Sequence, residues 1–320
     1  MDIQILLALQ QFREAIGGCL NGFFAFLTTI AVDYYIMLPG LILFWAFNKR
    51  AGVIGLGSYG AACYGVSALK STFCVYRPWV RSDLIKPLPE VMSGATGYSF
   101  PSGHSASVSG MYGGLIGVYR KRKGLCVLLG TMILLTMFSR LYVGVHTPQD
   151  VLAGLLVGAV GAALVFLADR FVQHHAKLDW VIVLAVAVLC AVLLPYMYFK
   201  SYPMDYVDGN LLVDPTKMTV GGFKDPGRLF GVVLGWFIER RFIRFDTDGT
   251  PYQKLMRSVV GALLFIGYWN IVMEPLGKAI GIGIVHFFLQ ASAPLLFMTV
   301  YPLAFKRVEQ RVSNPHKNDV

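Results

Sequence analysis

Long apolar stretches separated by short polar segments dominate the sequence. An α-helix needs roughly 20 predominantly apolar residues to cross a bilayer. Nine stretches meet or approach this length, at about residues 20–47, 52–72, 104–119, 125–143, 149–168, 180–199, 227–238, 257–273 and 280–304. The pattern predicts an all-α fold, a polytopic membrane helix bundle of about nine transmembrane helices.

Three segments modify this picture. Residues 1–19 carry apolar side chains at roughly helical spacing, which is typical of an amphipathic helix on a membrane surface, although a plain first turn of the bundle is the alternative. Asp33 interrupts the first long stretch, and we interpret it as a break between two helical pieces rather than as a functional acid. The long polar loop predicted over residues 200–225 can cover a site at its end of the bundle.

The composition agrees with a membrane protein. Of the 320 residues, 56% are hydrophobic and 14% are charged, whereas soluble domains average about 25% charged residues. No linker or sequence repeat divides the chain, so we expect a single membrane domain over residues 1–320. The five cysteines are scattered and mostly lie in apolar stretches, so we interpret them as packing residues rather than disulfide partners or metal ligands.

The net charge of +10 follows the predicted loops. Cytoplasmic loops of membrane proteins carry the excess of lysine and arginine. With the N-terminus outside, most of the 28 lysines and arginines fall in inside segments, which are residues 48–51, 120–123, 169–179, 239–257 and the C-terminal tail. Membrane insertion therefore explains the charge, and we expect membrane lipids but no nucleic acid as partners.

Glycine spacing predicts close contact between helices. Glycines recur every four residues at positions 227, 231 and 235, and again at 154 and 158. Small residues at this spacing let two helices approach closely in lipid. His286 lies in the last apolar stretch, and we interpret it as a satisfied core histidine rather than a catalytic group.

Three short polar motifs stand at the ends of apolar stretches. They are Lys70 with Arg77-Pro78, the run Pro101-Ser102-Gly103-His104, and Ser139-Arg140 followed by His146 and Asp150. The predicted topology places all three on the extracytoplasmic face, although their position played no part in choosing the orientation. Together they supply three cations, two imidazoles and one carboxylate, which can hold a phosphate, attack its phosphorus and protonate the leaving oxygen.

Two of the motifs coincide with predicted helix starts. Backbone N–H groups at a helix N-terminus attract anions, and Gly103 lets that backbone approach a phosphate because it has no Cβ. Thr147 is a predicted N-cap, so Asp150 is either a capping-box carboxylate or the partner that holds the His146 imidazole in one tautomer. Taken alone, the Pro101–His104 run fits a turn followed by a structural histidine better than a catalytic site.

The remaining motif places Lys70 seven residues before Arg77. If the helix continued past Lys70, the two cations would lie on one face about two turns apart. Snorkelling explains one lysine at a membrane edge but not this pair. Arginine offers a planar fork to two phosphate oxygens, and lysine offers a point charge. No cluster of acids suited to magnesium or zinc accompanies them, so we expect neither a metal nor another cofactor.

In combination, the three motifs resemble those of the type 2 phosphatidic acid phosphatase (PAP2) superfamily, which includes bacterial lipid phosphatases, glucose-6-phosphatase and the vanadium haloperoxidases. The resemblance covers about residues 52–165, and every motif position is present. The additional transmembrane helices predicted over residues 180–305 lie outside it. The nine-span layout resembles glucose-6-phosphatase, whereas the Asp150 position and the Gly-Tyr-Ser-Phe run before Pro101 resemble bacterial lipid phosphatases.

The resemblance implies a role for each residue. His146 would be the nucleophile that forms a phosphohistidine, Asp150 would orient it, and His104 would act as general acid and then as base. Five positions would bind the phosphate oxygens: Lys70, Arg77, Ser102, Gly103 and Arg140. The implied activity is metal-independent hydrolysis of a lipid phosphate or diphosphate at the extracytoplasmic face of a cell membrane.

Two other functions stay open at the level of sequence. A sugar phosphate, as in glucose-6-phosphatase, would use the same phosphate chemistry. A non-enzymatic transporter would account for the many spans and glycine-rich helices, although no inverted repeat is visible. Among lipids, the motifs fit undecaprenyl diphosphate, phosphatidylglycerol phosphate, phosphatidate and sphingoid-base phosphates alike.

Overall fold

The computed structural model describes residues 2–207 and 209–313, without the side chains of residues 33, 34, 312 and 313. Within these residues the predicted all-α fold is confirmed, because the strands form only one short antiparallel hairpin. The longer helices are α1 (Asp2–Ala15), α2 (Asn21–Ile30), α3 (Asp33–Ile42), α4 (Lys49–Phe73), α6 (Gly103–Val118), α7 (Lys123–Tyr142), α8 (Pro148–His174), α9 (Trp180–Phe199), α10 (Pro215–Ile238), α11 (Pro251–Tyr268), α13 (Gly283–Met298) and α14 (Val300–Ser313).

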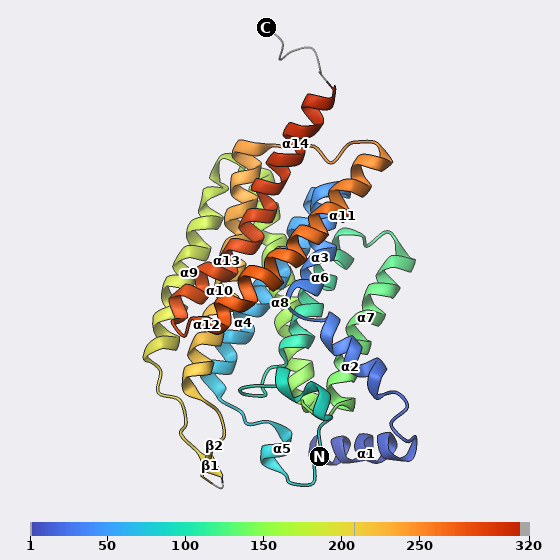
Figure 1. The fold of residues 1–320 in the computed structure, drawn as a ribbon, viewed down its shortest axis with the longest axis vertical. Helices are drawn as coiled ribbons and strands as arrows, with labels where there is room; N and C mark the ends of the chain where they lie inside the picture. The colour runs from blue at the N-terminus through green and yellow to red at the C-terminus, as the bar shows by residue number, and fades with distance from the viewer. Residues whose placement is uncertain (1, 208, 314–320) are drawn as a thin grey trace.

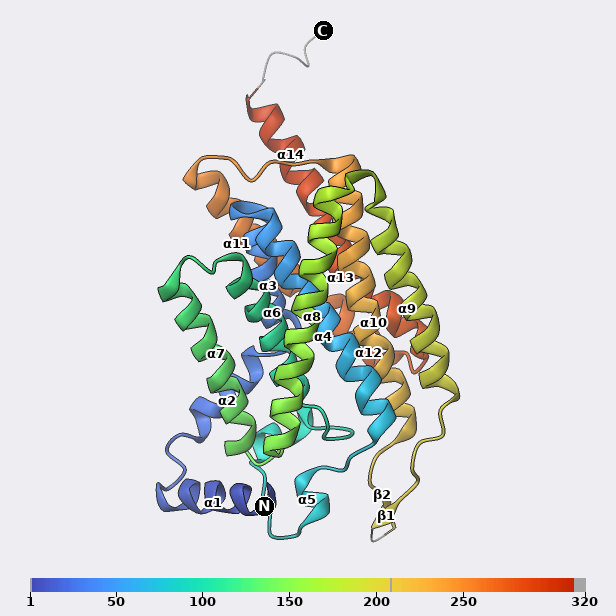
Figure 2. The same ribbon diagram turned by 180° about the vertical axis from the view of Figure 1, so that it is seen from behind.

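Shorter elements join or extend these helices. They are α5 (Pro78–Arg81), α12 (Glu274–Ala279), the 3-10 turns η2 (Pro89–Gly94) and η3 (Ala176–Leu178), the π-helical turns η1 (Leu43–Phe47), η4 (Glu239–Ile243) and η5 (Trp269–Met273), and the hairpin strands β1 (Tyr206–Val207) and β2 (Asn210–Leu211). In Figures 1 and 2 the long helices run between two ends of the molecule, with α5 and the hairpin at the lower end and α14 reaching the upper end.

α1 lies across the lower end of the bundle instead of joining it (Figure 1). The Arg13 guanidinium fastens it there by donating hydrogen bonds to the Tyr142 carbonyl at 3.2 Å and the Lys86 carbonyl at 2.7 Å. This arrangement favours the surface-helix interpretation of residues 1–19 over a first turn of the bundle.

The predicted count of nine spans is not confirmed. Six helical segments of the described chain are long and apolar enough to cross a membrane, and α2 with the segment Tyr35–Phe47, bent by 54°, would make a seventh. α6 has 16 residues and is packed among α4, α7 and α8. α10 carries several charged side chains, so neither helix fits the simple criterion of length and apolarity.

Two predicted boundaries are settled by the structure. The long first stretch is indeed broken, since α2 ends at Ile30 and α3 begins at Asp33, whose side chain lies outside the described residues. The polar loop predicted over residues 200–225 is wrong in its second half, because α10 already begins at Pro215. The Asp214 carboxylate caps this helix by accepting hydrogen bonds from the N–H groups of Thr216 and Lys217 at 2.8 and 3.4 Å.

The predicted glycine contacts are confirmed. A Cβ added at Gly227 or Gly231 would lie 2.2 Å from a backbone carbonyl oxygen of α13, and one at Gly158 would lie 2.4 Å from the Ser109 Cβ of α6. α10 therefore packs directly on the backbone of α13, and α8 packs on α6. His286 is buried, as predicted, and bonds the Ile280 carbonyl through Nε2 at 2.7 Å, but its buried Nδ1 has no hydrogen-bond partner among the described residues, so this core histidine is only half satisfied.

The upper end of the bundle is held together by ion pairs. Lys49 pairs with Glu239 at 2.6 Å, and Arg50 pairs with Asp169 at 2.7 Å. Asp179, which is fully buried, accepts from both Arg240 and Arg241. These charges join α4, α8, the turn before α9 and η4, which follows α10, at the end opposite the three polar motifs (Figure 1).

Candidate active site

Four chain segments bring the motif residues together at the lower end of the bundle. They are the end of α4, the loop that leads into α6, the end of α7 and the start of α8. α4 stops at Phe73, where Cys74 adopts a left-handed conformation and its N–H bonds the Lys70 carbonyl at 3.1 Å. Arg77 therefore lies in the loop before α5, which corrects the expectation that Lys70 and Arg77 share one continuous helix face.

His146 is held through both of its ring nitrogens. Its Nδ1 lies 3.4 Å from Asp150 Oδ2, and its Nε2 lies 2.9 Å from Arg77 Nη1. The imidazole is 1% exposed. Because arginine can only donate, Nε2 must accept, and the proton of the neutral ring belongs on Nδ1 facing the carboxylate. This tautomer leaves a lone pair on Nε2.

Asp150 is placed for both functions that the sequence left open. It closes a capping box with Thr147, whose N–H donates to Asp150 Oδ2 at 2.8 Å, and the same oxygen faces His146. Ser99 Oγ also donates to Oδ2, at 2.6 Å, and lies 3.4 Å from His146 Nδ1. Sequence reasoning gave Ser99 no role, although its place in the run before Pro101, close to the second motif, was a usable signal.

The start of α6 offers backbone donors to an anion. Ser102 is the N-cap, and its own N–H donates to the Asp150 carbonyl at 2.9 Å, so the predicted contact of this amide with a phosphate is at odds with the structure. Gly103 and His104 occupy the first two helical positions. Their N–H groups have no intrahelical partner and make no hydrogen bond within the described residues. These two amides are the ones that can receive an anion.

The three predicted cations surround this point in different ways. Lys70 Nζ donates to the Tyr98 carbonyl at 2.7 Å and the Ser99 carbonyl at 3.2 Å. Arg77 donates to the Gly97 and Val145 carbonyls, at 3.1 and 3.0 Å, as well as to His146. Arg140 is buried, bonds Thr28 Oγ1 at 3.0 Å, and keeps an Nε without a partner among the described residues.

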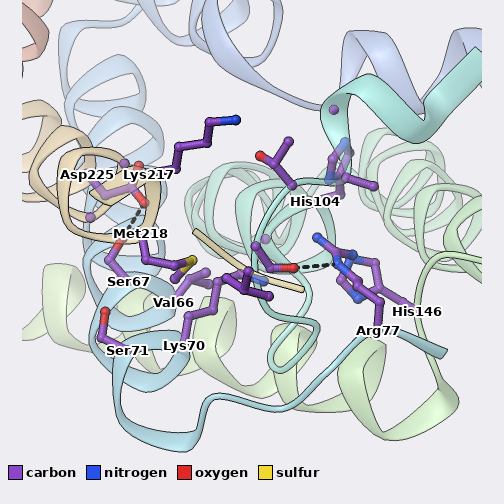
Figure 3. A pocket seen from close by; sticks show the side chains of 18 of the residues that line it. Val66, Ser67, Lys70, Ser71, Arg77, His104, His146, Lys217, Met218 and Asp225 are labelled. Atoms are coloured by element: carbon purple, nitrogen blue, oxygen red, sulfur yellow. Dashed lines mark hydrogen bonds between the residues drawn. The ribbon is translucent and has the colours of Figure 1, made fainter. Parts of the chain in front are cut away.

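A cavity of about 470 Å³ opens beside these groups. Lys70, Arg77, His104 and His146 line it, and Figure 3 shows the two histidines and Arg77 on one side of it. Gly103 also lines it, whereas Arg140 and Asp150 lie behind the wall. The wall facing His146 comes from α4 and α10, and Lys217 reaches over the cavity from that side (Figure 3).

The surroundings keep His146 uncharged. Burial lowers the pKa of its imidazole well below the usual value of 6.5, and the positive charges of Arg77, Arg140 and Lys70 lower it further. A neutral imidazole retains the Nε2 lone pair. The site therefore brings an imidazole with a lone pair on Nε2, a second imidazole, Lys70, Arg77 and a helix N-terminus to one cavity, with Arg140 outside its lining, and this set of groups suits transfer of a phosphoryl group.

The comparisons with known proteins agree with this geometry. A family model described as the PAP2 superfamily matches residues 51–173, and one described as the PAP2 superfamily phosphatase transmembrane extension matches residues 223–313. Undecaprenyl-diphosphatase BcrC of Bacillus subtilis is 30% identical over 152 residues, which are 47% of this chain and 75% of the relative. The chain belongs to the PAP2 superfamily.

Two further relatives of this PAP2 protein match over shorter shares of their length. An undecaprenyl-diphosphatase of Sulfolobus acidocaldarius is 30% identical over 141 residues, which are 44% of this chain and 66% of the relative. Sphingosine-1-phosphate phosphatase 2 of Mus musculus is 26% identical over 167 residues, which are 51% of this chain and 44% of the relative. The chain thus spans less than two thirds of either. No solved structure matches it.

The PAP2 match contains all eight predicted site residues, because residues 51–173 run from α4 to α8. The transmembrane extension begins within α10 and continues to the last described residue. The cavity is therefore built by both parts of the chain: the PAP2 match supplies the phosphate-binding candidates, and α10 supplies the opposite wall.

Proposed function

We propose that this chain is a membrane phosphatase that hydrolyses a lipid phosphate or diphosphate at the extracytoplasmic face through a phosphohistidine at His146. The observation that carries the proposal is the His146 imidazole fixed between Asp150 and Arg77, with Nε2 at a cavity lined by Lys70 and His104. The PAP2 relatives support this substrate class, because they are undecaprenyl-diphosphatases and a sphingosine-1-phosphate phosphatase.

In the first step, the Nε2 lone pair of His146 attacks phosphorus, and the bond to the leaving oxygen breaks. His104, protonated while the negative charge of the bound phosphate offsets the neighbouring cations, donates this proton to that oxygen, so the alcohol leaves uncharged. Arg77 exchanges its contact with Nε2 for a phosphate oxygen, and Lys70 and Arg140 add positive charge. The free N–H groups at the start of α6 bind a non-bridging oxygen. Asp150 stabilises the positive charge that develops on the histidine ring.

In the second step, a water molecule attacks the phosphorus of the phosphohistidine. His104, now neutral, accepts the proton of this water, and the bond between phosphorus and Nε2 breaks. Inorganic phosphate leaves, and His146 returns to the tautomer held by Asp150. Fixed cations supply the charge stabilisation throughout, so we propose that the reaction needs no metal ion. Within the described residues, no group of three or more histidine, cysteine or acidic side chains is placed to hold one.

The proposed location of the site is the extracytoplasmic side of the membrane. The support is the distribution of charge, because the lysine- and arginine-rich segments lie at the end opposite the site (Figure 1). Cys19 is exposed near the site end. In a variant whose other cysteines are replaced, Cys19 in intact cells should react with a membrane-impermeant maleimide, whereas a cysteine placed at Arg122 should not.

Purified protein should release phosphate from lipid substrates without added metal. The panel is phosphatidate, phosphatidylglycerol phosphate, undecaprenyl diphosphate and glucose 6-phosphate, each assayed in excess EDTA. We expect release from at least one lipid at a rate that EDTA leaves within about twofold, and inhibition by vanadate, which mimics five-coordinate phosphorus. Release from glucose 6-phosphate alone would identify a sugar phosphatase instead. Complete loss in EDTA with recovery by a metal ion would contradict the proposed mechanism.

The pH dependence should report the lowered pKa of His146. Because burial and the neighbouring cations disfavour the charged ring, His146 gains its proton only at a pH below its usual 6.5. We expect the acid limb of kcat/KM to fall below that pH. The profile should be measured with two substrates whose phosphate groups have different pKa values. An acid limb that falls at the same pH with both substrates reports a group of the protein rather than of the substrate. A common limb above pH 6.5 would contradict the assignment.

A further inference from the structure

The catalytic cavity has a second polar wall that the proposed reaction does not use. Beyond Lys70, the cavity runs along α4 past Ser67 and Tyr59, and α10 lines it with Asp225 and Arg228. Figure 3 shows Ser67 and Asp225 facing the cavity on the side away from His146 and Arg77. The far part of the cavity thus carries a cluster of polar side chains among apolar ones such as Val66 and Met218, and a lipid tail alone does not call for such a cluster.

These side chains form a connected set. Ser67 Oγ donates to Asp225 Oδ2 at 2.5 Å, and Arg228 Nη1 donates to Asp225 Oδ1 at 3.2 Å. Arg228 also donates through Nε to Gln290 at 2.8 Å and through Nη1 to the Tyr59 hydroxyl at 3.2 Å. Arg228 is therefore tied to α4 and α13, which gives it a structural role.

Asp225 differs from Arg228 in its exposure. The Asp225 side chain is 21% exposed and lines the cavity, whereas that of Arg228 is 10% exposed. Placing an ionisable side chain among membrane helices costs free energy, and such side chains are retained mainly at functional sites. Since Arg228 already balances the charge of Asp225, the pair can bind a neutral polar group without burying an uncompensated charge.

The reaction geometry determines which part of a substrate meets this wall. In phosphoryl transfer the attacking and leaving groups lie roughly in line through phosphorus. His104 protonates the leaving oxygen, so this oxygen lies beside His104, and the rest of the alcohol continues from there along the cavity toward the α4 and α10 wall (Figure 3). Ser67 precedes Lys70 by three residues on the same helix face, a rise of about 4.5 Å. A hydroxyl group one or two carbons from the leaving oxygen can span that distance.

We propose that Ser67 and Asp225 form a subsite that binds a hydroxyl group of the leaving alcohol and so select hydroxyl-bearing substrates. The subsite rests on the proposed function and deepens it. Asp225 accepts the hydroxyl proton, and the hydroxyl oxygen accepts from Ser67 or from Arg228. An ammonium group would face the positive charges of Lys70 and Arg228, and an apolar group would displace water from Asp225 without replacing its hydrogen bonds.

The subsite assigns a task to the transmembrane extension. Asp225 and Arg228 belong to the region matched by the extension, residues 223–313, whereas the nucleophile belongs to the PAP2 match. The two regions meet in one cavity through the contact of α10 with α4. The proposed residues of phosphoryl transfer therefore all lie in the PAP2 match, whereas the subsite is shared, with Ser67 from the PAP2 match and Asp225 from the extension.

The test compares two lipids whose leaving alcohols differ in whether a hydroxyl group stands beside the leaving oxygen. Dioleoyl phosphatidylglycerol phosphate leaves as an alcohol with a neighbouring hydroxyl group, and dioleoyl phosphatidate leaves as one without it. The first lipid also carries an additional phosphodiester, so the variants described below assign the preference to the subsite. We expect kcat/KM of the wild-type protein to be at least about tenfold higher for the hydroxylated lipid, the size of one good hydrogen bond to a charged group. Glucose 6-phosphate, assayed in parallel, distinguishes a soluble hydroxylated substrate from a lipid one.

Two variants then locate the preference. Asp225→Asn should reduce the ratio of the two kcat/KM values by about tenfold, and the milder Ser67→Ala by a smaller factor. Asp169→Asn is the matched control, because it alters an ion-paired carboxylate at the opposite end of α8 and should leave the ratio unchanged. A ratio measured within one variant is insensitive to a general loss of folded protein.

The possible outcomes are distinguishable. A wild-type ratio near one, or a ratio that both variants leave unchanged while phosphate release continues, overturns the subsite and leaves the proposed function intact. Absence of release from every lipid and from glucose 6-phosphate overturns both. A preference for glucose 6-phosphate that Asp225→Asn abolishes supports the subsite and moves the hydroxyl group to a soluble substrate.

Discussion

His146→Ala is expected to lower the rate of phosphate release by a factor on the order of 10⁴ or more. The variant lacks the nitrogen that is proposed to attack phosphorus. His104, at the start of α6, cannot replace it, because no carboxylate of the described residues bonds its ring in the way that Asp150 faces His146. The measurement is the initial rate with the best lipid of the panel, in detergent micelles at fixed protein concentration.

The control for this variant is His174→Ala. His174 is exposed at the far end of α8, so its removal should leave the rate within about twofold. A substrate with a labelled phosphate adds a direct readout of the phosphohistidine. After rapid denaturation without acid, the wild-type protein should carry labelled phosphate that is stable to base and released by acid, and His146→Ala should carry none. Full activity of His146→Ala would remove this residue from the mechanism.

Gly231→Ala is expected to give the largest loss of stability, about 3 kcal/mol or more. The added Cβ would lie 2.2 Å from the Ala291 carbonyl oxygen and 2.8 Å from its carbonyl carbon, both of them backbone atoms. The contact can be relieved only if α10 and α13 move apart along their whole interface. Thermal unfolding in detergent, followed by size-exclusion chromatography, should show a lower midpoint and a larger aggregated fraction.

Gly130→Ala is the same substitution in another helix, and it is expected not to lower the stability. No atom lies within 4 Å of the Cβ that would be added at Gly130 in α7. Alanine stabilises a helix interior by about 0.5–1 kcal/mol relative to glycine, so this variant should be unchanged or slightly more stable. Equal stability of Gly231→Ala and Gly130→Ala would contradict the close packing of α10 on α13.

The helices that the sequence predicted well are those whose apolar runs face lipid. The stretches at 125–143 and 180–199 correspond to α7 and α9 within two residues at each end. The stretch at 227–238 captured only the second half of α10, because Lys217, Lys224 and Asp225 interrupt the apolar pattern in the first half. At least two of these side chains line a cavity, so they escape the lipid that a hydropathy pattern measures.

The candidate site likewise contains residues that the sequence placed correctly and residues that it did not. His104, Thr147 and Asp150 were placed correctly on helix starts, since caps are local features of a sequence. The positions of Ser99 and Arg77 depend on how loops fold against α8, which involves contacts distant in sequence. Spacing along a helix was therefore a poor guide for Arg77, whose helix ends before it.

A single oxygen atom, Asp150 Oδ2, accepts from the first residue of the α8 cap and from Ser99, and also faces the nucleophile. The first turn of this helix and the correct proton on His146 therefore form together. A chain still being inserted, with α8 not yet seated against the loop that carries Ser99, has an imidazole with no fixed tautomer. On the mechanism proposed above, such an immature protein would not hydrolyse lipids before its assembly is complete.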